Sequence, residues 1–141
     1  MRFLMIVKAN KDSEAGVLPD PKLLSAMGKF NEEMANSGVL VDAMGLQSSA
    51  KGARVKFAGD RRIVTDGPFA ETKELIAGFW IIQVKSRQEA IEWAKRSPNP
   101  HPGQESEIEI RQVFEAEDFG PNLTPELKEQ EERIRAQVAT Q

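Results

Sequence analysis

The single histidine of the chain, His101, is the natural candidate for proton transfer, because histidine is the side chain that changes charge near neutral pH. It lies in a stiff loop between Pro100 and Pro102. Asp66 is the second candidate, either as a general base or as the carboxylate that orients His101. Each has a structural alternative. His101 can be an ordinary surface residue, and Asp66 can bind backbone N–H groups in a turn, as aspartate often does.

Four further charged residues are candidates for binding a polar substrate: Arg54, Glu71, Lys73 and Arg111. Glu71 and Lys73 are two positions apart, so they do not face each other on a helix. Arg54 belongs to a basic hairpin that can attract a carboxylate or a phosphate. Arg111 shares the polar face of a strand with acidic residues and can bind an anion if that face lines a cavity. The alternative for all four is solvated surface, and charges on an edge strand also discourage edge pairing.

Composition excludes several classes of function. The chain has 141 residues and no cysteine, which excludes disulfides, thiol catalysis and cysteine metal sites. With one histidine and no spaced carboxylate cluster, we expect no metal and no cofactor. There is no Gly-rich phosphate loop and no nucleophile elbow. The net charge of -3 gives no general attraction to nucleic acid or to anionic membranes, and the basic hairpin lacks interleaved aromatic residues.

The N-terminus carries an apolar run at residues 3–7, too short for a signal peptide or a membrane span. We therefore expect a cytoplasmic protein without a membrane partner.

The candidate residues must be positioned by the segment 66–74, which reads DGPFAETKE. Gly67 tolerates positive φ and Pro68 has no backbone N–H, so the sequence predicts a sharp, rigid corner followed by the apolar anchor Phe69. A stiff corner beside a polar cluster can hold a binding site at low entropic cost. We predict that any site lies beside this corner, at the rim of a cavity. The alternative is that the corner only reverses the chain.

The remaining pattern predicts an α+β domain. Apolar or alternating runs predict strands at 3–7, 39–46, 75–84 and 107–111, and a hairpin at 53–65 that turns at Gly59-Asp60. Cap residues and apolar periodicity predict helices that begin after Asp20, Ser86 and Thr124. Without the hairpin the order is βαββαβ, the ferredoxin-like arrangement, in which the first and third strands are central.

Those two central strands, 3–7 and 75–84, are the ones that are apolar on both faces. Two helices cover one face of such a sheet, so the other face needs a partner, and a second copy packed sheet to sheet is the simplest one. We therefore predict a homodimer. We divide the chain into a domain at 1–119 and a helical tail at 120–141, and the thin apolar face of the tail helix is suited to clasp the other subunit.

The segment 66–74 resembles the signature of the DGPF-motif proteins, a branch of the YCII-related family. The strands at 1–8 and 107–114 are similar to the first and last strands of that family. The resemblance implies a dimeric α/β-barrel, two ferredoxin-like subunits with facing sheets and a cavity between them. Relatives in that superfamily include small isomerases, dehydrochlorinase-like enzymes and cofactor-independent monooxygenases. YCII relatives are thought to use a His–Asp pair, which has no matching motif position here because the only histidine lies in the late loop.

Three functions remain open. One is a small cofactor-independent isomerase or lyase acting on a polar, carboxylated or aromatic metabolite, with His101 and Asp66 in proton transfer. Another is a module that binds such a metabolite without chemistry. The third, implied by relatives encoded beside extracytoplasmic-function sigma factors, is a regulatory partner of such a sigma factor.

Overall fold

The structure is a computed structural model that describes residues 1–141. The strands are β1 (Arg2–Lys8), β2 (Leu40–Gly45), β3 (Ala53–Ala58), β4 (Arg61–Asp66), β5 (Ile76–Gln83) and β6 (Ile108–Gln112). The α-helices are α1 (Lys11–Glu14), α2 (Pro21–Asn36), α3 (Arg87–Arg96) and α4 (Pro125–Ala139). Three short 3-10 helices are η1 (Ser49–Lys51), η2 (Thr72–Glu74) and η3 (Ala116–Asn122).

Four strands form one antiparallel sheet in the order β2-β5-β1-β6. This is the strand order of a ferredoxin-like domain, and it puts the two doubly apolar strands, β1 and β5, in the centre, which confirms the predicted fold. The register pairs Met5 with Trp80 and Ile110 across the middle of the sheet.

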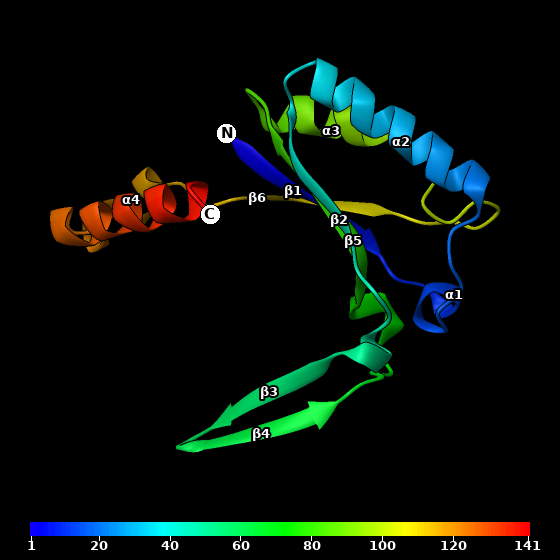
Figure 1. Cartoon of the computed structure of the whole chain (residues 1–141), viewed down its shortest axis with the longest axis horizontal. Coiled ribbons are helices and arrows are strands. Elements are labelled where there is room, and N and C mark those ends of the chain that lie inside the picture. The colour runs from blue at the N-terminus through cyan, green and yellow to red at the C-terminus, as the bar shows by residue number, and fades with distance from the viewer.

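Helices α2 and α3 cover one face of this sheet (Figure 1). Each begins at its predicted cap: the side chain of Asp20 accepts a hydrogen bond from Leu23 N at 2.8 Å, and that of Ser86 accepts one from Glu89 N at 3.1 Å. The side chain of Glu89 does not bond the backbone N–H of the cap residue Ser86, as it would in a capping box. It accepts instead from the N–H of Lys85, one residue earlier.

The core lies between the sheet and these helices. Its most buried side chains are Phe3, Met5, Met34 and Ile82. Trp80 packs edge-on against an α2 phenylalanine with ring centroids 5.5 Å apart, and its indole N–H donates to Asn31 at 2.7 Å. Apolar burial of this kind is the main stabilising term of the fold.

The opposite face of the sheet has no helix packed on it. Leu4, Ile6, Phe79 and Ile81 alternate with the core residues and therefore point to this side. Figure 1 shows α4 on the side remote from α2 and α3, where it stands away from the strands, and the β3–β4 hairpin projecting to the same side beyond one end of the sheet. We call this the open face of the sheet.

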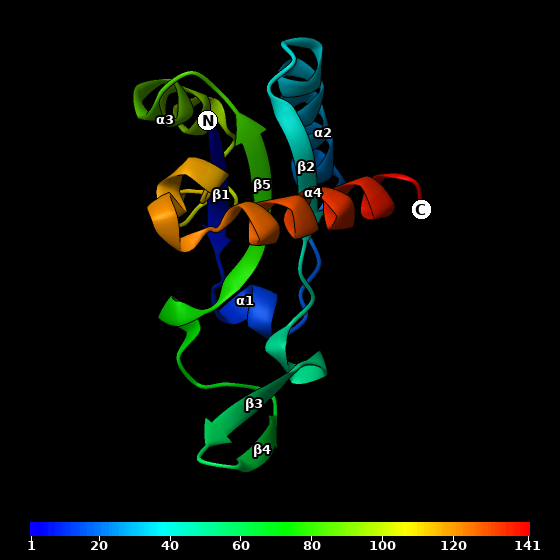
Figure 2. The same ribbon diagram turned by 90° about the vertical axis from the view of Figure 1, so that its left-hand side faces the viewer.

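Two elements project from the domain. The β3–β4 hairpin, with its turn at Gly59 as predicted, is a separate two-stranded sheet that extends beyond one end of the four-stranded one (Figures 1 and 2). Helix α4, capped by Thr124 as predicted, crosses in front of the open face (Figure 2).

The segment 9–19, for which no helix is predicted, contains the short helix α1, whose first turn is closed by a capping box between Asn10 and Ser13. Four residues are too few to show an apolar period. No helix of the chain is both long enough and apolar enough to cross a membrane.

Candidate functional site

The corner predicted at Asp66–Phe69 packs directly on η1. The N–H of Gly67 donates to the carbonyl of Gly52 at 2.9 Å. A Cβ at position 67 would lie 1.7 Å from the carbonyl oxygen of Ser49. Glycine is therefore required here because the two backbones approach closely. The sequence predicts a positive φ as the reason for this glycine, but φ of Gly67 is not positive. The Gly67–Pro68 peptide is cis.

The carboxylate of Glu14, a residue that belongs to no motif in the sequence, anchors this corner. Glu14 accepts a hydrogen bond from the backbone N–H of Ser49 at 3.0 Å and another from the Ser49 hydroxyl. The same hydroxyl oxygen accepts from the N–H of Phe69 at 3.0 Å. Glu14 thus links the end of α1 to both η1 and the corner.

Two of the predicted binding residues, Arg54 and Glu71, meet at the corner. Nη1 of Arg54 lies 3.8 Å from Oε2 of Glu71, and its guanidinium stacks over the ring of Phe69 at 3.8 Å from the centroid. Both partners of the ion pair are about half exposed. This contact ties the hairpin to the corner, and it occupies both charges.

Lys73 lines a different, polar pocket beside the corner. The pocket measures about 380 Å³ and lies between the residues after β1, the 3-10 turn η2 and the loop after α3. Its lining residues are Ala9, Asn10, Lys11, Asp12, Thr72, Lys73 and Gln104.

The side chain of Gln104 holds the walls of this pocket together. Its carbonyl oxygen accepts from Asn10 Nδ2 at 3.3 Å, and its own amide donates to Asp12 at 3.3 Å. The two lysines, Lys11 and Lys73, form no ion pair within the chain. The pocket therefore presents two ammonium groups and one carboxylate, that of Asp12, which is hydrogen-bonded to Gln104 and not paired with either lysine.

His101 flanks this pocket without lining it. Its Nε2 lies 2.7 Å from the carbonyl oxygen of Lys8, the residue before the pocket wall, and its carbonyl accepts from Gln104 N at 3.1 Å. A carbonyl only accepts, so Nε2 carries the proton that it donates to Lys8. The histidine is partly buried and held in one orientation.

The structure does not place Asp66 next to His101. It is the exposed last residue of β4, opposite Ala53 in the hairpin, and it forms no ion pair or hydrogen bond with the histidine. The two candidates for proton transfer thus belong to separate parts of the site.

Arg111 lies on the open face and belongs to a row of charges. Lys8 Nζ lies 3.2 Å from Oε1 of Glu109, and Arg111 Nη1 lies 3.4 Å from its Oε2. The hydrogen-bonded ammonium of Lys8, reinforced by Arg111, lowers the pKa of Glu109 below its ordinary value. Arg111 is therefore at the rim of the open face, away from the polar pocket.

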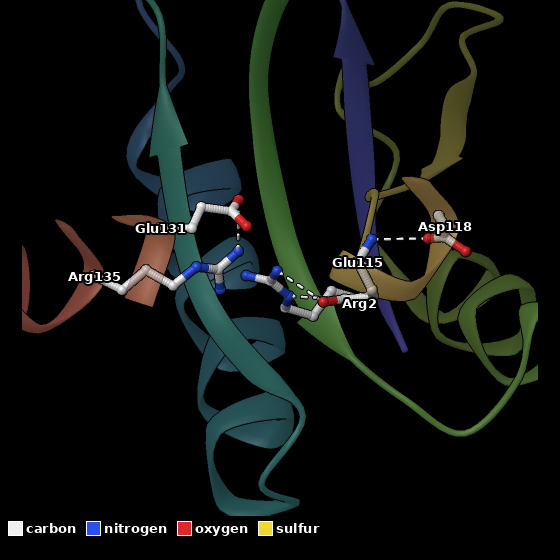
Figure 3. A network of polar contacts seen from close by, with 5 residues as sticks. All are labelled: Arg2, Glu115, Asp118, Glu131 and Arg135. Atoms are coloured by element: carbon white, nitrogen blue, oxygen red, sulfur yellow. Dashed lines mark hydrogen bonds and ion pairs between the residues drawn. The ribbon is translucent and has the colours of Figure 1, made fainter. Parts of the chain in front are cut away.

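A second network joins the other end of β1 to the C-terminal segment (Figure 3). Nε and Nη2 of Arg2 donate to the two oxygens of Glu115 at 3.0 and 3.1 Å, and Asp118 accepts from the Glu115 N–H. The hydrogen bond from Arg2 lowers the pKa of Glu115, with a smaller contribution from the charge of Arg135 on α4. Arg135 also pairs with Glu131, four residues earlier in the same helix, at 3.9 Å.

Comparison with known proteins adds two findings. Residues 1–117 match the model of the YCII-related domain. An uncharacterised protein of Rhizobium meliloti (strain 1021) is 30% identical to this chain over 83 residues, which cover 59% of this chain and 67% of that protein. The matched family domain includes every strand of the fold and all residues of the polar pocket.

Proposed function

The chain belongs to the YCII-related domain family, and from that premise we propose that it is a homodimer that binds a small anionic metabolite in the polar pocket beside the corner. The observation that supports the proposal is a pocket that holds two ammonium groups, those of Lys11 and Lys73, against the one carboxylate of Asp12, which accepts from Gln104 and forms no ion pair with either lysine. An excess of positive charge in a concave site attracts an anionic ligand.

The chemistry of the lining favours a carboxylate or a phosphate. Lysine binds such groups as a point charge, and the hydroxyl of Thr72 with the amide of Asn10 can add directional hydrogen bonds. A volume of about 380 Å³ lies in the range of small-molecule sites, about 300–1,000 Å³. A metabolite of a few carbons fits this description.

The homodimer is supported by the surface of the single chain. It exposes 10390 Å², whereas a compact monomer of 15.7 kDa exposes about 7,300 Å². This excess exposed area of about 3,000 Å² is larger than the area that a single subunit buries in a dimer interface of standard size. The open face of the sheet, with Leu4, Phe79 and Ile81, offers an apolar surface on which a second copy can pack.

His101 favours a second candidate function, an isomerase or lyase acting on the same ligand. A histidine with Nε2–H fixed on the Lys8 carbonyl offers Nδ1 as a general base. Proton transfer then rests on His101 alone, with no requirement for Asp66.

Ligand binding is tested by isothermal titration with sodium phosphate, succinate and benzoate, using sodium chloride at equal ionic strength as the blank. We expect one of these anions to bind, and Lys73→Gln or Lys11→Gln to weaken it about tenfold, or about 1.4 kcal/mol. Lys56→Gln, an exposed lysine in the hairpin, is the matched control and should leave the affinity unchanged. Binding that survives both pocket substitutions would reject this pocket, and Asp66→Asn then reports whether the ligand binds at the corner.

If none of the anions binds, the small-anion proposal fails and a protein partner, such as an extracytoplasmic-function sigma factor, becomes the favoured function. Catalysis is tested separately with the anion that binds. Exchange of its protons in D2O, followed by NMR, should require the wild-type protein and be lost in His101→Asn while affinity is retained. Exchange at the wild-type rate in His101→Asn would exclude the histidine as the base.

A further inference from the structure

The β3–β4 hairpin carries an apolar stripe that its own chain leaves uncovered. Val55, Phe57 and Val64 lie on one face of the hairpin, and Phe57 is 71% exposed. Arg62 stacks over the ring of Phe57 at 4.6 Å from its centroid. A two-stranded hairpin without further packing is at best marginally stable in water. The geometry of the hairpin therefore requires a covering surface from outside the chain.

Helix α4 has the same property. Leu127, Ile134 and Val138 share one face of the helix, and all three are about half exposed. Glu131 lies on the same helical face as this stripe, and Figure 3 shows Glu131 and Arg135 on the side of α4 that is turned toward the Arg2–Glu115 pair. The apolar stripe is therefore turned toward the sheet, but its residues remain about half exposed.

The two elements are attached at opposite ends of the sheet. The hairpin leaves the sheet where β5 begins, at Ile76, which pairs with Lys8 at the end of β1. The C-terminal segment leaves after β6, whose Gln112 pairs with Phe3 at the start of β1. The seven residues of β1 span about 23 Å, so the elements of one chain stay apart. Both project to the side of the open face (Figure 1).

Their charges are complementary. The hairpin carries four basic and two acidic residues, whereas η3 and α4 together carry six acidic and three basic residues. When two sheets pack face to face about a two-fold axis that runs across the strands, the hairpin end of one sheet lies over the α4 end of the other. An interface of this symmetry makes each contact twice.

We propose that the hairpin of each subunit packs its Val55-Phe57-Val64 stripe on the Leu127-Ile134-Val138 stripe of α4 in a second copy of this chain. The inference rests on the homodimer of the proposed function, and it assigns the two projecting elements as reciprocal arms around the facing sheets. The chain exposes more surface than a compact monomer of its mass, and the two arms account for the part of that difference that the open face of the sheet does not.

The absence of natural cysteine allows a direct test by cross-linking. The double variant Phe57→Cys/Ile134→Cys is treated with a short bis-maleimide at micromolar concentration and resolved on a denaturing gel. We expect a covalent dimer, and the same product when the two single variants are mixed. The matched control, Phe57→Cys/Arg87→Cys, places the second thiol at the start of α3 on the far side of the sheet and should remain monomeric on the gel.

Sedimentation of the untreated wild type separates this proposal from the dimer itself. A wild-type dimer without a Phe57–Ile134 cross-link would overturn the arm contact and leave the dimer standing. Efficient cross-linking by Phe57→Cys alone would also overturn it, because the hairpins would then meet each other. A wild-type monomer would reject both proposals. As a second measurement, Phe57→Glu should weaken dimerisation about tenfold, whereas Leu24→Glu, at an exposed leucine of α2 on the far side of the sheet, should not.

Discussion

At the scale of single residues, two glycines differ in whether the structure leaves room for a side chain. Gly67 is irreplaceable because any Cβ would overlap the backbone oxygen of Ser49 at 1.7 Å. Gly28 lies in an exposed position of α2, and nothing lies within 4 Å of where its Cβ would be. The first glycine holds the corner against η1, and the second only weakens a helix.

We therefore predict opposite effects of the same substitution. Gly67→Ala should lower the free energy of unfolding by about 2 kcal/mol or more, because backbone atoms must move apart. Gly28→Ala should raise it by about 0.5–1 kcal/mol through helix propensity. Urea denaturation followed by circular dichroism measures both. A neutral Gly67→Ala would mean that η1 can shift away from the corner without loss.

At the scale of elements, the ion pair between β1 and the C-terminal segment makes stability depend on pH. The pKa of Glu115 in the folded chain is lowered from its ordinary value of 4.5, chiefly by the hydrogen bond from Arg2. A lowered pKa contributes stability that is present above the ordinary value and is lost as the pH falls through the lowered one. Glu109, lowered by Lys8, acts in the same direction at the other end of the sheet.

We predict that the melting temperature of the wild type falls as the pH drops below about 4.5, and that Glu115→Gln reduces this dependence. Glu117→Gln is the matched control, since Glu117 is exposed and forms no ion pair. Scanning calorimetry between about pH 6 and pH 3 measures the slopes. Equal slopes for wild type and Glu115→Gln would show that the pair does not contribute.

At the scale of the whole molecule, the proposed homodimer predicts that folding and association are coupled. A domain that exposes 10390 Å² buries only twelve residues and leaves much of its apolar surface in water. Association that covers this surface stabilises the folded state by mass action.

The melting temperature should therefore rise with protein concentration. Removal of residues 121–141, which deletes α4, should weaken the dimer while leaving the four-stranded sheet folded. Sedimentation velocity and circular dichroism on the truncated chain measure the two quantities. A melting temperature independent of concentration for the full chain would contradict this coupling.

The fold could be predicted from sequence because its signals are local. The continuous apolar runs at 3–7 and 75–84, and the caps at Asp20 and Ser86, each act within one element. The polar pocket and the anchor of the corner could not be predicted in the same way, because their contacts are distant: Asn10 and Gln104 in the pocket are 94 positions apart, and Glu14 and Ser49 in the anchor are 35 apart. Polar segments without a period carry no signal about which of them meet. Of these features, the sequence predicts only Lys73 of the pocket and the corner itself.

The Glu14 anchor also has a consequence for amide hydrogen exchange. The N–H of Ser49 donates to the Glu14 carboxylate, and the N–H of Phe69 donates to the Ser49 hydroxyl, which itself donates to the same carboxylate. Movement of Glu14 away from η1 therefore removes the acceptor of the Ser49 N–H and frees the hydroxyl that holds Phe69. We expect the two amides, twenty positions apart, to open in one event, with η1 and the corner as one cooperative unit of local unfolding.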